Sequence, residues 1–429
     1  MSSQARNAHP LWPLLCAGIV LSLLALPAAL GGEGEATWFK GNTHTHSLWS
    51  DGDGLPEMAA DWYKAHGYAF LVLTDHNIIA RGERWKDVTK LDQSKKLLEK
   101  CAQRFGPDWN QTRTQDGKLE VRLKTLDDFR GKFEEPGKFL LIGGEELSDK
   151  GSVHLTAFNL AECLKPPGGA TITATLNAGI AALRKAGPGV LVFINHPNFN
   201  YALTAEDLVE ASDARFVEVA NAHPIVHSDG DAQHPPVERL WDIANSVRVA
   251  RLKIPPLLGV ASDDTHSYHA ATGAVPGVSW MMVRARELTT EALIAALERG
   301  DFYCSTGVLL KTLDYDAERG TLSLEVQPKA GVEYTISFIG TPADADTAGQ
   351  PVTAADKKGK PLRVSQRYSD DIGKTLSVVK GTRATYQLTG AELYVRAVVR
   401  TNQPPLRKDL FEQAWTQPVG WEKRVPRRP

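Results

Sequence analysis

Residues 37–77, TWFKGNTHTHSLWSDGDGLPEMAADWYKAHGYAFLVLTDHN, decide the fold of this chain. The apolar runs predict strands over 37–42 and 68–74, and the amphipathic stretch between them predicts a helix over 55–66. Each strand leads into a polar cluster at its carboxyl end. A strand, a helix and a second strand in this order form the repeating unit of a parallel sheet with crossover helices.

The same alternation continues through most of the chain. Further strands are expected over 139–143, 153–159, 190–194, 216–220, 257–261 and 279–283, and further helices over 172–186, 235–249 and 290–299. With about seven such units, an α/β fold that closes into a barrel is favoured over an open sheet.

Two segments depart from this alternation. Residues 80–135 are charged and carry no ligand-like cluster, so we expect a partly helical insertion, either a lid over the site or a plain surface excursion. Residues 309–429 show short alternating runs punctuated by Gly, Pro and Asp, and contain no histidine. They predict a small antiparallel β-domain, which leaves 36–308 for the barrel.

The first residues, 1–31, have the form of a secretory signal. Arg6 precedes an apolar stretch over 11–26, and small residues follow it. The stretch is short for a membrane span, which favours a cleaved signal over an uncleaved anchor. We therefore expect an exported protein, periplasmic or extracellular, with no membrane partner beyond a possible anchor in this segment.

Composition and missing motifs exclude several classes of protein. The net charge is −2 and no basic arm is present, which disfavours nucleic-acid binding. Cys101, Cys163 and Cys304 form neither a disulfide framework nor a zinc clip, and we expect small buried side chains. The chain has no G-x-S-x-G elbow, Walker loop or dinucleotide fingerprint. Residues 51–54 are not a calcium loop, because Trp62 stands where the closing Glu should be.

Polar clusters near the strand ends are the main functional signal. They are His44-Thr-His46, Asp51, Asp75-His76, Glu146, His154, His196 and Asp264-Thr-His266. Side chains alternate along an extended segment, so His44 and His46 face the same side and can hold one divalent ion. Because strand ends meet at one rim of a barrel, we expect these clusters to form one multinuclear metal site.

The ligand types indicate the metals and the chemistry. Imidazoles mixed with carboxylates suit zinc, manganese or iron better than calcium. A shared carboxylate would hold two ions roughly 3.5–4 Å apart, and a hydroxide held there is a nucleophile at neutral pH. Among the other histidines, His66 closes the predicted helix and is expected to interact with the carboxyl end of the helix dipole. His227 and His234 lie in a loop rich in Pro and Asp and are expected at the surface. His223 and His269 lie close to strand ends and are candidates for contacting substrate or donating a proton.

The run GNTHTHSLWSDG…LVLTDHN…GGEELS…VHL…FINHP…ASDDTH resembles the PHP (polymerase and histidinol phosphatase) superfamily of metallo-phosphoesterases. The resemblance covers residues 38–305 and implies a distorted (β/α)7 barrel with metal ions at its carboxyl-terminal rim. The family pattern of Glu, apolar residue and Ser fits Glu146 rather than Glu145. The D-x-H spacing likewise selects Asp264 rather than Asp263.

By this resemblance, nine side chains hold two or three divalent ions. The first set is His44, His46, Glu146 and Asp264; Glu146 bridges to a second set with His154 and His196; the third set is Asp51, His76 and His266. Asp75 would orient a ligand rather than bind an ion. Glu146, Asp264 and His266 are the expected catalytic residues.

The segments FYCSTG and AWTQPV resemble a branch that includes carbamate- and ester-cleaving metallohydrolases. That resemblance places Asn221, Ser305 and Thr306 near the substrate. The expected function is hydrolysis of a small-molecule phosphate ester by a metal-bound hydroxide in an exported enzyme. A carboxylic or carbamic ester hydrolase using the same site is the first alternative, and a non-catalytic metal-binding module is the second.

Overall fold

The structure is a computed structural model that describes residues 35–90, 94–406 and 410–426. The signal or anchor expected over 1–31 therefore lies outside the described residues. Among the residues that are described, no helix combines the length and the hydrophobicity needed to cross a bilayer.

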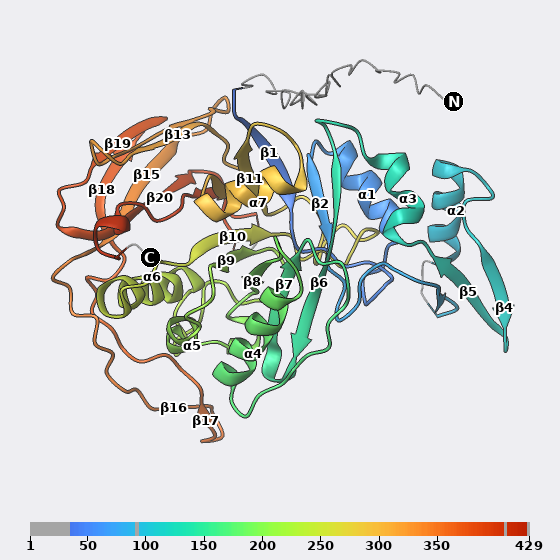
Figure 1. Cartoon of the computed structure of the whole chain (residues 1–429), viewed down its shortest axis with the longest axis horizontal. Helices are drawn as coiled ribbons and strands as arrows, with labels where there is room; N and C mark the ends of the chain where they lie inside the picture. The colour runs from blue at the N-terminus through green and yellow to red at the C-terminus, as the bar shows by residue number, and fades with distance from the viewer. Residues whose placement is uncertain (1–34, 91–93, 407–409, 427–429) are drawn as a thin grey trace, which may run out of the picture. The chain divides into compact units, whose positions relative to one another are not determined.

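A 13-stranded sheet contains most of the expected strands (Figure 1). Its order is β10-β9-β8-β7-β6-β2-β1-β11-β12-β21-β20-β15-β18. The strands of its first part are β1 (Thr37–Asn42), β2 (Phe70–Leu73), β6 (Leu140–Asp149), β7 (Val153–Phe158), β8 (Leu191–Ile194), β9 (Phe216–Asn221) and β10 (Leu258–Ser262). The remaining strands are β11 (Trp280–Ala285), β12 (Phe302–Ser305), β15 (Tyr334–Pro342), β18 (Lys374–Lys380), β20 (Glu392–Thr401) and β21 (Gln413–Trp415).

Strand pairing departs from a strict β/α alternation at β7. The neighbours β1, β2 and β6 run parallel, as do β8, β9 and β10, but β7 is antiparallel to both β6 and β8. Only the turn Lys150–Ser152 joins β6 to β7, which is too short for a crossover, so the two strands form a hairpin.

Closure into a barrel is not shown by the strand pairing. The ends of β1 and β10 are linked by one isolated bridge, Thr45 to Thr265, and within the described residues no ladder joins these two strands. The expectation of a mixed α/β fold with a large sheet rich in parallel strands is confirmed. The closed (β/α)7 barrel stays a prediction.

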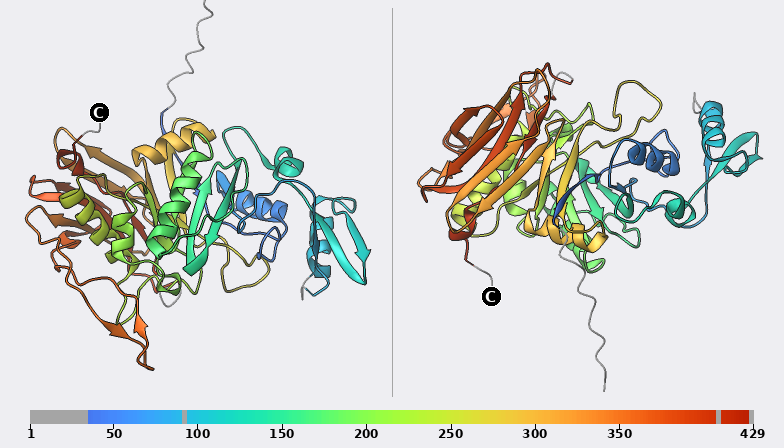
Figure 2. Two further views of the ribbon diagram at one scale, coloured as in Figure 1. Left: turned by 60° about the horizontal axis from the view of Figure 1, so that its bottom comes forward. Right: turned by 90° about the horizontal axis from the view of Figure 1, so that it is seen from above.

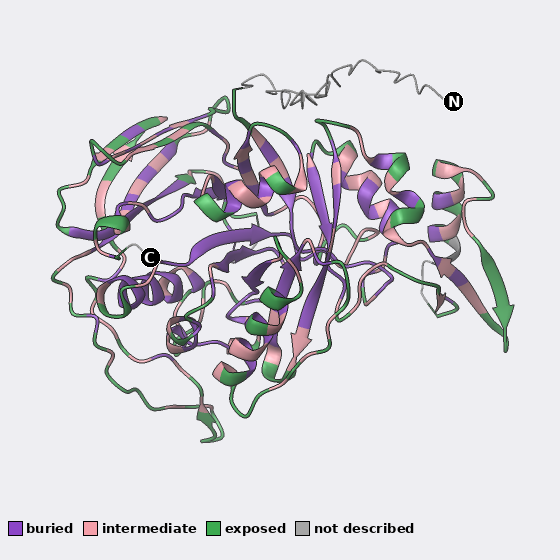
Figure 3. Ribbon diagram, in the orientation of Figure 1, coloured by how far each residue is buried: buried purple, intermediate pink, exposed green. Residues whose placement is uncertain are grey.

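Helices pack on this sheet (Figures 1 and 2). They are α1 (Pro56–Ala65), α3 (Leu126–Phe133), α4 (Ile172–Lys185), α5 (Ala205–Glu210), α6 (Val237–Val247) and α7 (Thr290–Arg299). Helix α4 contacts β7 and β8, α6 contacts β9, and α7 contacts β11. In α4 the buried residues Leu176, Ile180 and Leu183 recur at helical spacing, so one stripe faces the sheet. The strands that these helices cover are buried (Figure 3).

Residues 80–135 form the expected partly helical insertion and also a small sheet that the sequence did not predict. Its elements before α3 are β3 (Arg84–Asp87), α2 (Ser94–Phe105), β4 (Thr112–Gln115) and β5 (Lys118–Leu123), with sheet order β3-β5-β4. Both views in Figure 2 place this sheet at the opposite end from the C-terminal strands. Its apolar side packs on Trp49 and Leu55, in the loop after β1.

The C-terminal region is built from antiparallel strands, as expected. Strands β13 (Leu310–Asp316), β14 (Thr321–Val326) and β19 (Arg383–Gln387) form a separate sheet, and β16 (Ala354–Ala355) pairs with β17 (Pro361–Leu362). Leu322 and Leu324 of β14 share a core with Ile336 and Phe338 of β15, as in two packed sheets. Strand β21 pairs with both β12 and β20, so the large sheet continues from the first region into the second.

The cysteines follow the expectation in two cases out of three. Cys101 and Cys304 are buried, whereas Cys163 is exposed, and all three are free thiols. Cys163 lies beyond β7 in the connection to α4, where no sheet or helix covers it.

Candidate metal centre

The structure brings all nine expected ligands together. They come from the ends of β1, β2, β8 and β10, from the loop after β1, and from the β6–β7 hairpin. Their ligand atoms form four overlapping groups in which all atoms lie within 4.8 Å of one another. The groups are His46, Asp51, His76 and His266; His44, Glu146 and His196; His44, His46 and Asp264; and His76, Glu146 and His154.

Glu146 occupies the centre, and its two oxygens face different histidines. Its Oε1 lies 3.1 Å from His154 Nδ1 and 3.2 Å from His196 Nε2. Its Oε2 lies 2.7 Å from His76 Nδ1 and 3.4 Å from His46 Nε2. A carboxylate in this position can bridge two cations, the role that the family resemblance implies.

Asp264 connects the two histidines that follow β1. Its Oδ1 lies 3.3 Å from His44 Nε2 and 3.1 Å from His46 Nε2. On the outer side of the cluster, Asp51 Oδ1 lies 3.4 Å from His266 Nε2. Carboxylates therefore alternate with imidazoles across the whole cluster.

Several of these buried ligand atoms have no hydrogen-bond partner. They include Nε2 of His44 and of His46, Oε2 of Glu146 and Oδ1 of Asp264. Glu146 Oε2 is among them because its close approach to His76 lacks hydrogen-bond geometry. Buried polar atoms without partners are costly, and a cation coordinated by these nitrogens and oxygens removes that cost. The residues present therefore fit a group of divalent metal ions.

The carboxylates of the cluster oppose the effect of burial at two of the imidazoles. Burial alone would lower the pKa of His44, but the charges of Asp264 and Glu146 hold this pKa well above its usual value. Burial also opposes protonation of His266, yet its hydrogen bond to Asp51 and the charge of Asp264 raise its pKa to about 9. A field that holds protons on imidazoles also favours cations, which replace those protons on binding.

Two ligands have an uncommon backbone conformation. His196 has φ 21° and Asp264 has φ 49°, in the region that non-glycine residues rarely adopt. Such strain costs on the order of 1–3 kcal/mol and persists where surrounding contacts enforce it. For His196 one such contact is the hydrogen bond from its backbone N to Glu218 Oε2, at 2.8 Å. These outliers are consistent with a functional site.

The sequence did not indicate a role for Glu218, which hydrogen-bonds to two of the ligand residues. It is buried on β9, in the apolar run FVEVAN. His44 Nδ1 donates to its Oε1 at 2.9 Å, and this fixes the tautomer in which Nε2 is open to an ion. The sequence feature that could have indicated Glu218 is the presence of a charged residue in the middle of a buried strand.

Asp75 holds a turn and does not join any of the four ligand groups. Its Oδ1 accepts hydrogen bonds from the backbone N of Ser47 at 2.8 Å and of Ser50 at 3.0 Å. The turn leads directly to Asp51. Asp75 therefore positions a ligand through the backbone, in line with the orienting role expected for it.

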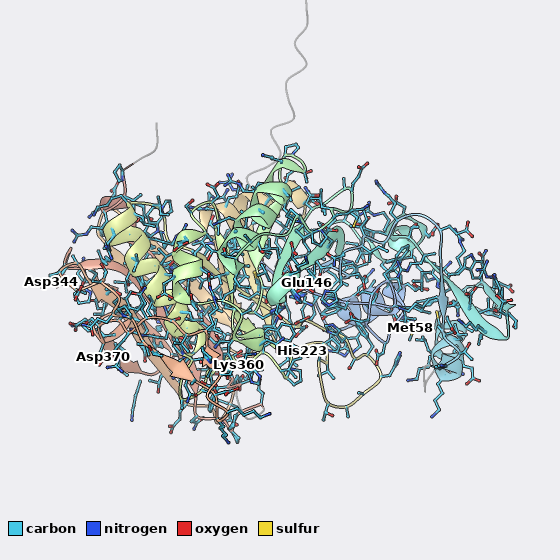
Figure 4. All side chains as sticks on the ribbon, turned by 90° about the horizontal axis from the view of Figure 1, so that it is seen from below. Met58, Glu146, His223, Asp344, Lys360 and Asp370 are labelled. Atoms are coloured by element: carbon cyan, nitrogen blue, oxygen red, sulfur yellow. The ribbon has the colours of Figure 1, made fainter. Side chains whose placement is uncertain are left out.

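A cavity of about 180 Å³ opens over the ligands. Its lining residues are Asp51, His76, Glu146, His154, His196, Phe199, His223, Ile225, Val226, Asp264 and His266. Figure 4 labels Glu146 and His223, which belong to this wall. None of the described lining residues of this cavity comes from 80–135. The insertion instead supports the Asp51 loop, since Lys86 Nζ donates to the carbonyl of Ser50 at 2.7 Å.

The structure brings two of the five substrate-near candidates into contact with the cluster. His223 lines the cavity, and its ring centroid lies 5.1 Å from that of His266. Asn221 Nδ2 donates to Asp264 Oδ2 at 3.2 Å and to Glu218 Oε2 at 2.9 Å. Asn221 therefore orients a ligand from a buried position.

The other three candidates lie elsewhere. His269 and Ser305 are absent from the cavity wall, and the Ser305 hydroxyl donates to the carbonyl of Val308. Thr306 lines a second, neighbouring cavity.

Of the two histidines expected at the surface, one is exposed and one is buried. His227 is exposed, as expected. His66 follows the last residue of α1, the position predicted for it. His234 is buried, because it stacks on Tyr201 with a centroid distance of 3.7 Å and bonds to Asp231.

Three solved structures are similar to this chain. The chain is similar to a two-domain protein from Bacteroides vulgatus containing a predicted PHP-like metal-dependent phosphoesterase, with 14% identity, a TM-score of 0.37, and coverage of 89% of this chain and 95% of that one. It is also similar to PsfC from Pseudomonas syringae, with 15% identity, a TM-score of 0.33, and coverage of 61% and 89%.

A third similar structure is a putative metal-dependent phosphoesterase from Bifidobacterium adolescentis, with 16% identity, a TM-score of 0.28, and coverage of 54% and 90%. No protein-family model and no curated protein matches the chain.

Proposed function

We propose that the protein is a metal-dependent hydrolase that cleaves a phosphate ester. The observation that carries this proposal is the convergence of nine imidazole and carboxylate side chains, with buried ligand atoms left unpaired, at the floor of a cavity. Two or three divalent ions, of zinc, manganese or iron, fit this donor set. Bound ions would activate water and neutralise the charge that develops on the phosphoryl oxygens.

Side chains of the protein set the spacing of the ligands and form the walls of the cavity. Glu146 and Asp264 fix the spacing of the surrounding imidazoles. Phe199, Ile225 and Val226 give the cavity an apolar side, which limits the access of bulk water. No lysine or arginine is among the described residues of this wall, so the chain itself supplies no cation for a phosphate there.

We also propose that the protein is exported. Support comes from the signal-like form of residues 1–31, with Arg6 before an apolar stretch and small residues after it.

Parallel assays with 4-nitrophenyl phosphate and 4-nitrophenyl acetate test the proposed reaction. We expect hydrolysis of the phosphate, its loss after chelation and its recovery when metal is restored. His46→Ala should lower kcat/KM by more than about 100-fold, because it removes a direct ligand. The matched control is His66→Ala, which removes an exposed imidazole stacked on Trp62 and should leave kcat/KM unchanged. Hydrolysis of the acetate alone, or none of either by metal-loaded protein, would contradict the proposal.

A further inference from the structure

A second cavity, of about 660 Å³, is present in addition to the metal cavity. Its apolar lining comes from Pro224, Ala271, Val275, Val278, Trp280 and Leu406. A volume of several hundred Å³ is typical of small-molecule sites, whereas the metal cavity has only about 180 Å³. The metal cavity therefore has room for a phosphoryl group but little room for the remainder of an ester.

Residues that are neighbours in the chain line the two cavities. Pro224 lines the second cavity, while its chain neighbours His223 and Ile225 line the metal cavity. On the other side, the loop that lines the second cavity follows His266 directly. His266 N donates to the carbonyl of Ala274 in that loop, at 2.9 Å. The second cavity therefore lies beside the metal cavity.

Exposed apolar side chains gather around these two cavities. Ile225 is 51% exposed and Leu406 is 52% exposed, and each lines one of them. Phe411 is 42% exposed, and its carbonyl accepts a hydrogen bond from Thr306, another lining residue. These are three of the six large hydrophobic side chains exposed among the described residues. Such clustering marks a binding surface rather than scattered surface residues.

The charges of the second cavity do not favour an ionic occupant. Its charged lining residues are Lys329 and Glu412, and these two form a salt bridge with each other. A second phosphate or a carboxylate on the ligand would have to break this pair or remain without a counter-charge, which is costly. A neutral group has no such cost.

We propose that the second cavity binds the alcohol portion of the substrate and selects an apolar, uncharged one, such as an arylalkyl group. This inference rests on the proposed function. In the reaction, water adds to phosphorus, the ester P–O bond breaks, and a proton passes to the alcohol oxygen, giving inorganic phosphate and the free alcohol. Lys329, Leu406 and Glu412 follow the first region, so the C-terminal part of the chain takes part in selecting the substrate.

The test compares 2-phenylethyl phosphate with ethyl phosphate, whose leaving alcohols have similar basicity. We expect kcat/KM to be at least about tenfold higher for the larger ester, from apolar area buried in the cavity. Ala271→Trp, which fills the cavity from an exposed loop position, should lower this ratio about tenfold. Leu406→Ala should also lower it. The matched control is Ala181→Trp, an exposed position on α4 outside both walls, which should leave the ratio unchanged.

Binding of 2-phenylethanol to the metal-loaded protein, followed by saturation-transfer NMR, separates this inference from the proposed reaction. If the alcohol binds and Ala271→Trp abolishes binding, the cavity assignment stands even if no phosphate ester is hydrolysed. If both esters are hydrolysed equally well and the alcohol does not bind, the cavity assignment is overturned while the phosphoesterase stands. An unchanged ratio in both Ala271→Trp and Leu406→Ala would also overturn it.

Discussion

The carboxylate of Glu218 fixes the orientation of two ligands without belonging to any ligand group. Its Oε1 accepts from His44 Nδ1 and from the Ser262 hydroxyl, and its Oε2 accepts from the backbone N of His196 and from Asn221 Nδ2. All four of these hydrogen-bond partners are donors. His44, whose Nδ1 bonds to Glu218, presents its Nε2 to the metal cluster.

Glu218→Gln should weaken metal binding by about 10- to 100-fold, the usual effect of losing a partner that orients a metal-binding histidine. The new amide would turn a donor towards groups that are themselves donors. Titration of metal into the metal-free protein measures the affinity. Excess metal should restore kcat, a rescue that a purely structural defect would not show.

The matched control for this change is Glu145→Gln. Glu145 is also a buried carboxylate, on β6, but it accepts from the backbone N of Leu164 and is absent from the four ligand groups. Its amide variant should bind metal as tightly as the unchanged protein. Equal losses in both variants would show that Glu218 has no specific role.

At the residue scale, the sequence predicted which side chains would meet but not what supports them. The nine ligands lie near strand ends, and strand ends can be located from apolar runs. Glu218 and Asn195, which donates to Glu146 Oε1 at 2.8 Å, act through contacts between segments distant in the sequence. His234 was predicted at the surface because its loop is rich in Pro and Asp, but ring stacking on Tyr201 buries it.

At the scale of elements, the turn between β1 and α1 depends on a carboxylate from the end of β2. Besides the backbone N of Ser47 and of Ser50, Asp75 accepts hydrogen bonds from both serine hydroxyls, at 2.8 and 2.7 Å. The turn carries Asp51, whose side chain is 56% exposed and therefore not held by packing. The position of this ligand thus depends on the Asp75 contacts.

Asp75→Asn should loosen this turn while preserving side-chain volume. An amide NH2 would face donors, so some of the hydrogen bonds, each worth about 1–3 kcal/mol when a buried group loses its partner, would be lost. Hydrogen exchange at the Ser47 and Ser50 amides should become at least about tenfold faster. In the control Asp61→Asn, a change on α1 that affects an ion pair with Arg104 of α2, exchange at these amides should not change. Equal protection in both variants would refute this role of Asp75.

The elements that the sequence predicted well are the apolar ones. The strand over 37–42 has the bounds predicted for it, and α7 has the bounds of its predicted helix. Strand β6 continues beyond 143 to Asp149, because pairing with β7 extends it through polar residues. Strand β4, with the sequence TRTQ, is fully exposed and has no apolar alternation to reveal it. Strand β4 is held in the sheet by antiparallel pairing with β5.

Over the whole molecule, the second cavity joins regions that the sequence divided into two domains. The described residues from 36 onward belong to one compact unit, and the large sheet passes from β12 to β21 and β20. The second cavity takes lining residues from both sides of this junction, such as Trp280 and Glu412. The sequence could not predict this cavity, because its walls are distant in the chain and follow no motif.

Metal content per chain, measured by elemental analysis after dialysis of metal-loaded protein, is the most direct test of the metal centre. We predict more than one divalent ion per chain in the unchanged protein. Glu146→Gln should lose at least one ion, because the two oxygens of Glu146 face different sets of histidines, and His66→Ala should lose none. A protein that retains less than one ion per chain, or a Glu146→Gln variant that retains the full complement, would contradict the account.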